Sequence, residues 1–77
     1  MLHLKNIKIE NNTAQAEYSP EDSGWWGRIL VDLKSEEIIS CDRNPEYRFM
    51  HPGHARQQLV KMAKSNDTRT ECMVMWY

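Results

Sequence analysis

Apolar and polar residues alternate along much of this 77-residue chain, which is the pattern of half-buried β-strands. The first apolar series is Leu2, Leu4, Ile7 and Ile9, and its phase slips by one residue at Asn6. A one-residue slip turns the rest of a strand to the opposite face of a sheet. We therefore expect either a β-bulge at Asn6 or a strand that uses both faces.

A second strand is predicted directly after the first. Asn11–Asn12 predicts a tight hairpin turn, because Asn tolerates the positive φ angles that such turns require. Ala14, Ala16 and Tyr18 then alternate with polar residues. Residues 19–24 (SPEDSG) consist of turn-forming residues and should end this strand.

Two further strands and a long loop follow. Residues 25–33 alternate as a third strand, with Trp25 and Trp26 pointing to opposite faces. After a short turn, residues 38–41 form the fourth strand. Residues 42–51 show no clear period and predict a loop of about ten residues, longer than most connections.

A single helix is expected over about residues 52–65. Pro52 fits the first helical position, where its missing N–H costs nothing. Apolar residues recur after it at helical spacing, namely Ala55, Leu59, Met62 and Ala63. A last strand is predicted from Cys72, where apolar residues alternate up to Trp76.

These elements predict one α+β domain over residues 1–77, a mostly antiparallel sheet of four or five strands packed against one helix. An apolar fraction of 40% argues against disorder, and no apolar run approaches the length of a membrane helix. Residues 1–10 alternate instead of showing a signal-peptide layout, so a cytoplasmic location is expected. Cys41 and Cys72 are expected to be reduced strand residues, with a disulfide left open.

Charge is unevenly distributed although the net charge is only −1. Residues 1–42 carry four basic and eight acidic side chains, whereas residues 43–69 carry six basic and two acidic ones. Such a dipolar chain can orient a partner or a second copy of itself.

The histidines raise the possibility of a metal site. His51 and His54 lie close together in sequence, with Cys41 ten residues before His51. Zinc needs three or four nitrogen or sulfur ligands, so His3 or Cys72 would have to complete the set. The spacing matches no zinc motif, and we expect neither a metal nor another cofactor.

Acid–base chemistry is a second possibility. His51 or His54 beside Glu46 could act as a general base if hydrogen-bonding geometry allows. No nucleophile motif or phosphate-binding loop accompanies them. A non-enzymatic protein is therefore expected.

A basic surface between residues 43 and 64 is the clearest candidate binding site. Its residues are Arg43, Arg48, His51, His54, Arg56, Lys61 and Lys64. Such a surface can contact phosphates, and Trp26 or Tyr47 could stack on bases. The pI of about 6.3 lies well below that of dedicated nucleic-acid binders.

The strand aromatics point to self-association. One helix covers one face of a sheet, so one of Trp25 and Trp26 has to face solvent, a partner or the helix, unless the sheet curls enough to enclose both. Gly27 is expected to make room for a large neighbouring side chain. A homo-oligomer formed through the open face or an edge strand is the favoured explanation. Three methionines are expected to be core filler, namely Met62, Met73 and Met75.

Five segments together resemble a group of small proteins of Gram-positive, gut-type bacteria. They are Asp22–Gly24, Arg28–Leu33, Glu37–Ile39, Pro52–Ala55 and Val74–Tyr77. The resemblance implies a bacterial, cytoplasmic origin and a helix that starts at Pro52–Ala55. No activity and no functional residue carry over from that group.

The sequence is thus best explained by a small non-enzymatic interaction module that self-associates, with residues 43–64 as its polar binding surface. Binding of nucleic acid or another anionic ligand by the same surface is the alternative. A small acid–base enzyme is the third hypothesis. No membrane partner is expected.

Overall fold

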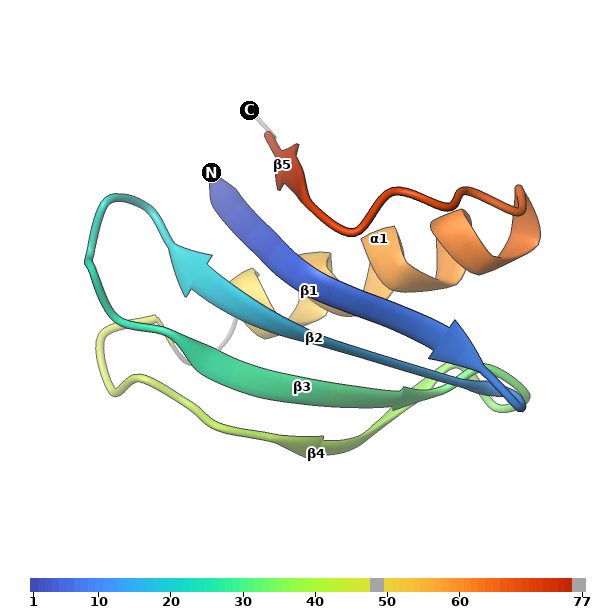
Figure 1. Cartoon of the computed structure of the whole chain (residues 1–77). Coiled ribbons are helices and arrows are strands. Elements are labelled where there is room, and N and C mark those ends of the chain that lie inside the picture. Colours follow the sequence, from blue (N-terminus) through green and yellow to red (C-terminus); the bar gives the residue numbers. More distant parts are fainter. Residues whose placement is uncertain (48–49, 76–77) are drawn as a thin grey trace.

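A five-stranded antiparallel sheet and one helix make up the computed structural model, which describes residues 1–47 and 50–75 (Figure 1). The elements are β1 (Leu2–Glu10), β2 (Thr13–Pro20), β3 (Gly27–Asp32), β4 (Glu37–Cys41), α1 (Met50–Lys64) and β5 (Cys72–Val74). The sheet order is β4-β3-β2-β1-β5. The predicted α+β fold is confirmed, as is the placement of the single helix before the last strand.

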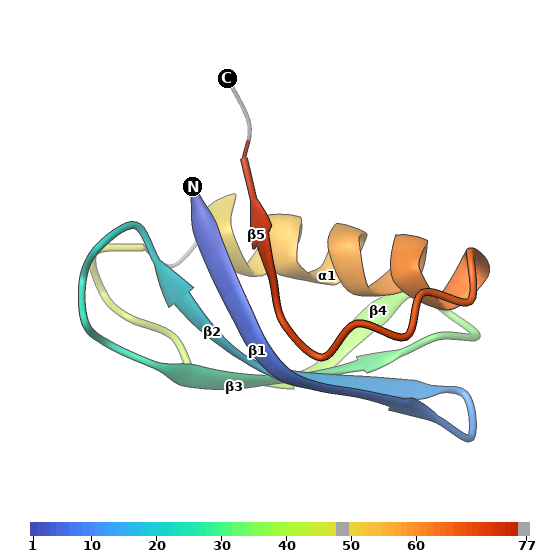
Figure 2. The ribbon, with the colours of Figure 1, turned by 45° about the horizontal axis from the view of Figure 1, so that its top comes forward.

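The helix covers only one face of the sheet, which we call the inner face. Figure 2 shows α1 entirely on one side, with the opposite, outer face bare. The core lies between α1 and the inner face and includes Leu2, Leu4, Tyr18, Ile29, Val31, Leu59 and Met62. The two edge strands, β4 and β5, receive fewer contacts from α1 than the strands between them.

The phase slip in the first strand is a bulge at Asn6. The pairing of β1 with β2 shifts register between Lys5 and Lys8, and Asn6 has a φ of 52°. The extra residue returns Ile7 to the same face as Leu4, and both side chains are buried. The bulge therefore lets one strand of irregular pattern serve a single core.

The predicted hairpin between β1 and β2 turns at Asn11 and Asn12. Their φ angles are 50° and 66°, the left-handed conformation that both central residues of a type I′ turn adopt. The turn pairs Glu10 with Thr13. The two asparagines thus explain why the strands meet in this register.

Trp25 and Trp26 precede β3 instead of starting it, so the predicted strand start is wrong by two residues. The Trp25 ring lies over Gly27 and meets Tyr18 edge-on at 5.6 Å. The hydroxyl of Tyr18 donates a hydrogen bond to the carbonyl of Asp42. Burial raises the pKa of the Tyr18 hydroxyl. The expectation that Gly27 makes room for a large side chain agrees with this packing.

Other boundaries differ by a few residues. β2 continues to Pro20, which pairs with Leu2, and α1 begins at Met50 rather than Pro52. Pro52 still lies in the first turn, where backbone N–H groups have no helical partner. β5 ends at Val74, and the predicted strand residues Trp76 and Tyr77 lie outside the described residues.

Two of the three methionines assigned to the core are exposed. Met62 is buried, but Met73 is 51% exposed and Met75 is 59% exposed. Met73 faces outward on the edge strand β5, and Met75 follows that strand, so α1 covers neither. The core-filler interpretation is therefore wrong for both.

The two cysteines lie on opposite edges of the sheet. Cys41 ends β4 and Cys72 starts β5, with three strands between them. At about 4.8 Å per strand, their backbones are separated by roughly 19 Å, far beyond the reach of a disulfide. Both thiols are free.

The close approach of Trp25 to Gly27 predicts the effect of adding a single methyl group. A Cβ on Gly27 would lie 2.4 Å from the Trp25 ring and 3.1 Å from the Cβ of Asp42. The ring cannot move away without losing its contact with Tyr18. Gly27→Ala should therefore lower the free energy of unfolding by about 1–3 kcal/mol in urea denaturation.

Gly53 is the matched control for this substitution. A Cβ there would meet nothing within 4 Å, and the residue is helical. Gly53→Ala should raise the free energy of unfolding by about 0.5–1 kcal/mol. Equal effects of the two alanines would contradict the packing of Trp25 over Gly27.

Candidate functional site

A groove runs between α1 and the turn that joins β3 to β4, and we call it the helix–turn groove. Its volume is about 430 Å³, and its lining includes Glu36, Arg56, Gln57, Val60, Lys61 and Lys64. Val60 is only 7% exposed and supplies an apolar floor. Three cations and one carboxylate therefore surround a partly apolar hollow.

The end of α1 is shaped so that its last lysines border this groove. Asn66 adopts a φ of 55°, its N–H donates to the carbonyl of Ala63, and the N–H of Asp67 donates to the carbonyl of Met62. This is the Schellman arrangement, which satisfies carbonyls left open at a helix end. Lys61 and Lys64 lie in the last turn, where positive charge is favourable beside the negative end of the helix dipole.

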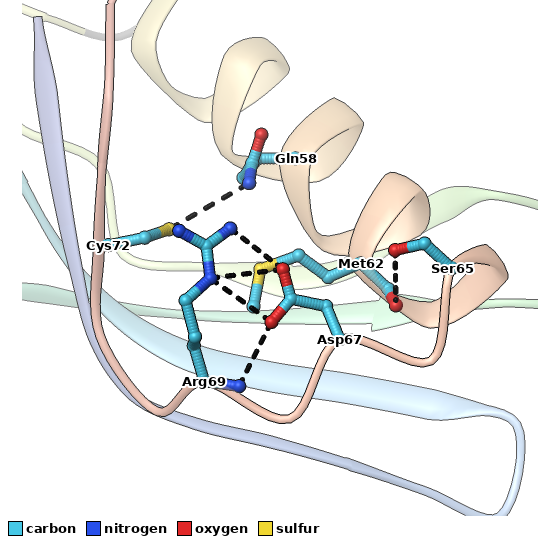
Figure 3. A network of polar contacts seen from close by, with 6 residues as sticks. All are labelled: Gln58, Met62, Ser65, Asp67, Arg69 and Cys72. Atoms are coloured by element: carbon cyan, nitrogen blue, oxygen red, sulfur yellow. Dashed lines mark hydrogen bonds and ion pairs between the residues drawn. The ribbon is translucent and has the colours of Figure 1, made fainter.

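Polar contacts fix the chain just after the helix (Figure 3). The guanidinium of Arg69 contacts both carboxylate oxygens of Asp67, the closer at 2.7 Å, and holds the pKa of that carboxyl below its usual range. Ser65, which also lines the groove, donates its hydroxyl to the carbonyl of Met62. Gln58 donates to the sulfur of Cys72 across the same region, and burial raises the pKa of that thiol.

Glu36 is the carboxylate inside the groove. Its carboxylate lies 3.1 Å from the ammonium of Lys64, and Arg56 donates to its backbone carbonyl at 3.2 Å. Glu36 also has a φ of 62°, which is unfavourable for a residue with a side chain other than Asn or Asp. The two cations of α1 thus contact the turn in this conformation and favour it by the small amount typical of exposed ion pairs.

The predicted basic surface is split in two. Arg56, Lys61 and Lys64 line the helix–turn groove together. His51 lies in the first turn of α1, ten residues before Lys61 and about 15 Å away along the axis. Arg43 is exposed beyond the far end of β4.

Two further residues of that surface add little to the groove. His54 is half-buried near the start of α1 and does not line the groove. Arg48 lies outside the described residues. Of the predicted basic residues that the structure describes, Arg56, Lys61 and Lys64 therefore share one concave site.

His51 is buried in a hydrogen bond that the sequence did not indicate. Its Nε2 lies 3.1 Å from Oε1 of Glu21. The same oxygen accepts a hydrogen bond from the N-terminal ammonium of Met1 at 3.0 Å. The hydrogen bond with His51, which has the larger effect, and the one from the N-terminal ammonium lower the pKa of Glu21. Tyr47 packs edge-on against the His51 ring at 5.0 Å. The cluster ties the start of α1 to the chain terminus and to the residues after β2.

The residues considered for a metal site or for acid–base chemistry have other partners in the structure. His3 lies 3.2 Å from the carboxylate of Glu71, and the backbone N–H of Glu46 donates to the side chain of Asn44. Within residues 1–47 and 50–75, no three His, Cys, Asp or Glu side chains gather as metal ligands would. The carboxylate paired with His51 is Glu21.

The outer face of the sheet is mostly polar. Trp26 is half-buried there, with the Lys5 ammonium 3.9 Å from its ring centroid and His3 edge-on at 5.1 Å. Next to it lies a hollow of about 510 Å³ lined by Asn6, Gln15, Glu17, Arg28, Leu30 and Ser40. The amide of Asn6 donates to the carboxylate of Glu17 within this hollow. The indole of Trp26 is thus partly covered by Lys5 and His3 of β1.

Two acidic residues were missed as parts of these sites. Glu21 and Glu36 lie 30 and 28 residues from their partners His51 and Lys64. No local spacing links residues so far apart, and both sit in turns with positive φ, a feature that only Gly and Asn signal in a sequence. The face of α1 that borders the groove was predictable from helical periodicity.

Comparison with known proteins adds no assignment: no family model, curated protein or solved structure matches this chain. In the part of the chain that the structure describes, no helix is long and apolar enough to span a membrane. The bacterial, cytoplasmic origin implied by the resemblance stays a prediction.

The Glu21 cluster predicts a dependence of stability on acid pH. The folded-state pKa of Glu21 is lowered, so its contribution is present above its ordinary value of 4.5 and is lost as the pH falls below it. The melting temperature of the wild type should therefore decrease more steeply below about pH 4.5 than that of Glu21→Gln. Thermal unfolding followed by circular dichroism between about pH 7 and 3 measures both.

Asp22→Asn is the control, because it removes a neighbouring exposed carboxylate that has no ion pair among the described residues. Its melting temperature should follow the wild-type pH profile. A Glu21→Gln profile parallel to the wild type would show that the cluster contributes nothing.

Proposed function

We propose that the protein is a small non-enzymatic interaction module that self-associates through its edge strand β4, forming a two-fold dimer with a continuous ten-stranded sheet. The observation that carries this proposal is the position of the exposed apolar side chains. Among the described residues, the exposed large hydrophobic ones are Ile39, Met73 and Met75. Ile39 lies in β4, and the two methionines lie in or directly after β5, so all three belong to the two edges of the sheet.

The outer face is a weaker candidate for the contact. Its indole is already covered by Lys5 and His3, and its hollow is lined by charged and polar groups such as Glu17 and Arg28. Packing two copies of this face together would desolvate these charges without new partners, which costs several kcal/mol per ion. An edge strand instead offers backbone N–H and C=O groups that a second strand can pair.

Strand β4 is the better of the two edges. It has five residues against three in β5, and Ile39 is 55% exposed at its centre. Ile39 is also the bulged residue at which the pairing with β3 shifts register, so it has no partner across that ladder. The bulge twists the edge locally, so a second strand gains few backbone hydrogen bonds there and the contact between Ile39 side chains has to contribute.

A two-fold β4–β4 pairing centred on Ile39 brings the two isoleucines together. In this register Glu37 faces Cys41 of the second copy, so no like charges lie directly opposite each other.

The same geometry limits the assembly. A two-fold contact consumes both β4 edges and leaves the short β5 edges outside, so it closes at a dimer instead of growing into a filament. Two five-residue strands bury less area than a standard interface of about 800 Å² per partner. The expected dissociation constant is on the order of 10–100 µM.

Light scattering tests this proposal. The average mass should rise from 9.1 kDa toward twice that value as the protein concentration increases from about 10 µM to about 1 mM. Ile39→Lys should remain at the monomer mass over the whole range, because charged edge residues block strand pairing. The exposure of Ile39 means that the monomer should keep its fold, which circular dichroism checks.

Met73→Lys is the matched control on the opposite edge, with a similar exposure of 51%. This variant should dimerise like the wild type. A wild type that stays monomeric at about 1 mM, or a Met73→Lys variant that loses the dimer while Ile39→Lys keeps it, would overturn the assignment of β4.

A further inference from the structure

The helix–turn groove is a cationic site that the dimer proposal does not use. Arg56, Lys61 and Lys64 face it from one side of α1, and Glu36 is the one carboxylate in its lining. The net charge of the groove is thus positive on a protein whose total charge is −1. Such a local reversal of charge selects ligands by electrostatic complementarity.

The protein's own Glu36 demonstrates which chemistry the groove accommodates. A carboxylate 3.1 Å from Lys64 and a carbonyl oxygen 3.2 Å from Arg56 occupy positions that a ligand's oxygens could extend. Glu36 is held there in an unfavourable backbone conformation with a φ of 62°. These oxygen–cation contacts add to the packing of Leu33 and Ile38, which flank the turn, against the core.

Lys61 is the cation that the protein itself leaves available. Arg56 and Lys64 are both engaged by Glu36, whereas Lys61 has no ion pair within residues 1–47 and 50–75. Its side chain is exposed at the border of the groove, above the buried Val60. A ligand with a carboxylate for Lys61 and an apolar group for Val60 would match both.

A peptide fits these features better than a nucleic acid does. The groove is short, about 430 Å³, and has an apolar floor with no aromatic side chain in its lining on which a base could stack. A short segment in which carboxylates alternate with apolar residues needs no stacking partner and offers an apolar group to Val60.

We infer that the helix–turn groove binds a short acidic, partly apolar peptide segment of a partner protein, with Lys61 contacting a ligand carboxylate and Val60 contacting an apolar side chain. This site lies on α1 and the β3–β4 turn, so it does not depend on dimerisation through Ile39. Glu36 then competes with the ligand for Lys64. Removal of that competitor should strengthen binding.

Fluorescence anisotropy with a labelled Glu/Val peptide of about twelve residues tests the inference. The expected dissociation constant is on the order of 100 µM at low salt, with weaker binding as salt is raised. Lys61→Glu should weaken binding about tenfold or more, and Glu36→Gln should strengthen it about two- to fivefold. Lys8→Glu is the control: Lys8 is 59% exposed on the outer face, and the same charge change there should alter affinity less than about twofold.

Three results would overturn the inference. They are no binding at about 1 mM peptide, equal losses for Lys61→Glu and Lys8→Glu, and binding of a single-stranded oligonucleotide of similar charge at least as tightly as the peptide. Ile39→Lys should bind the peptide like the wild type. Failure of the groove and failure of the β4 dimer are therefore distinguishable.

Discussion

One helix has to cover a five-stranded sheet, and this constraint shapes the rest of the molecule. Helix α1 has 15 residues and is therefore about 22 Å long, but it is only about 10 Å wide. The sheet is roughly 19 Å from edge strand to edge strand. The helix can therefore seal the central strands, and the apolar side chains that it cannot reach appear at the edges.

Most of the fold follows from periodicity in the sequence. The Asn11–Asn12 turn, the alternation in β1 to β3 and the apolar stripe of α1 each have a local cause that can be recognised in the chain. The strand order and the exposure of Met73 do not, because they depend on which strands become edges. Trp25 shows another limit, since the alternation predicts that the third strand starts there, whereas β3 starts at Gly27.

The candidate sites were predictable only in part. Helical spacing placed Lys61 and Lys64 on the solvent side of α1, where they line the groove. Their partner Glu36 comes from a turn 28 residues before Lys64, and His51 is drawn into the protein by Glu21 from another turn. Such pairs arise from tertiary approach, so a sequence shows the charges but not which of them meet.

Hydrogen exchange at the backbone amides of β4 tests the central claim, that the unsealed edge is where a second copy binds. Protection at Ile39 and its neighbours should increase with protein concentration, while exchange in β5 stays constant. Exchange in β4 that is independent of concentration up to about 1 mM would show that this edge faces only solvent.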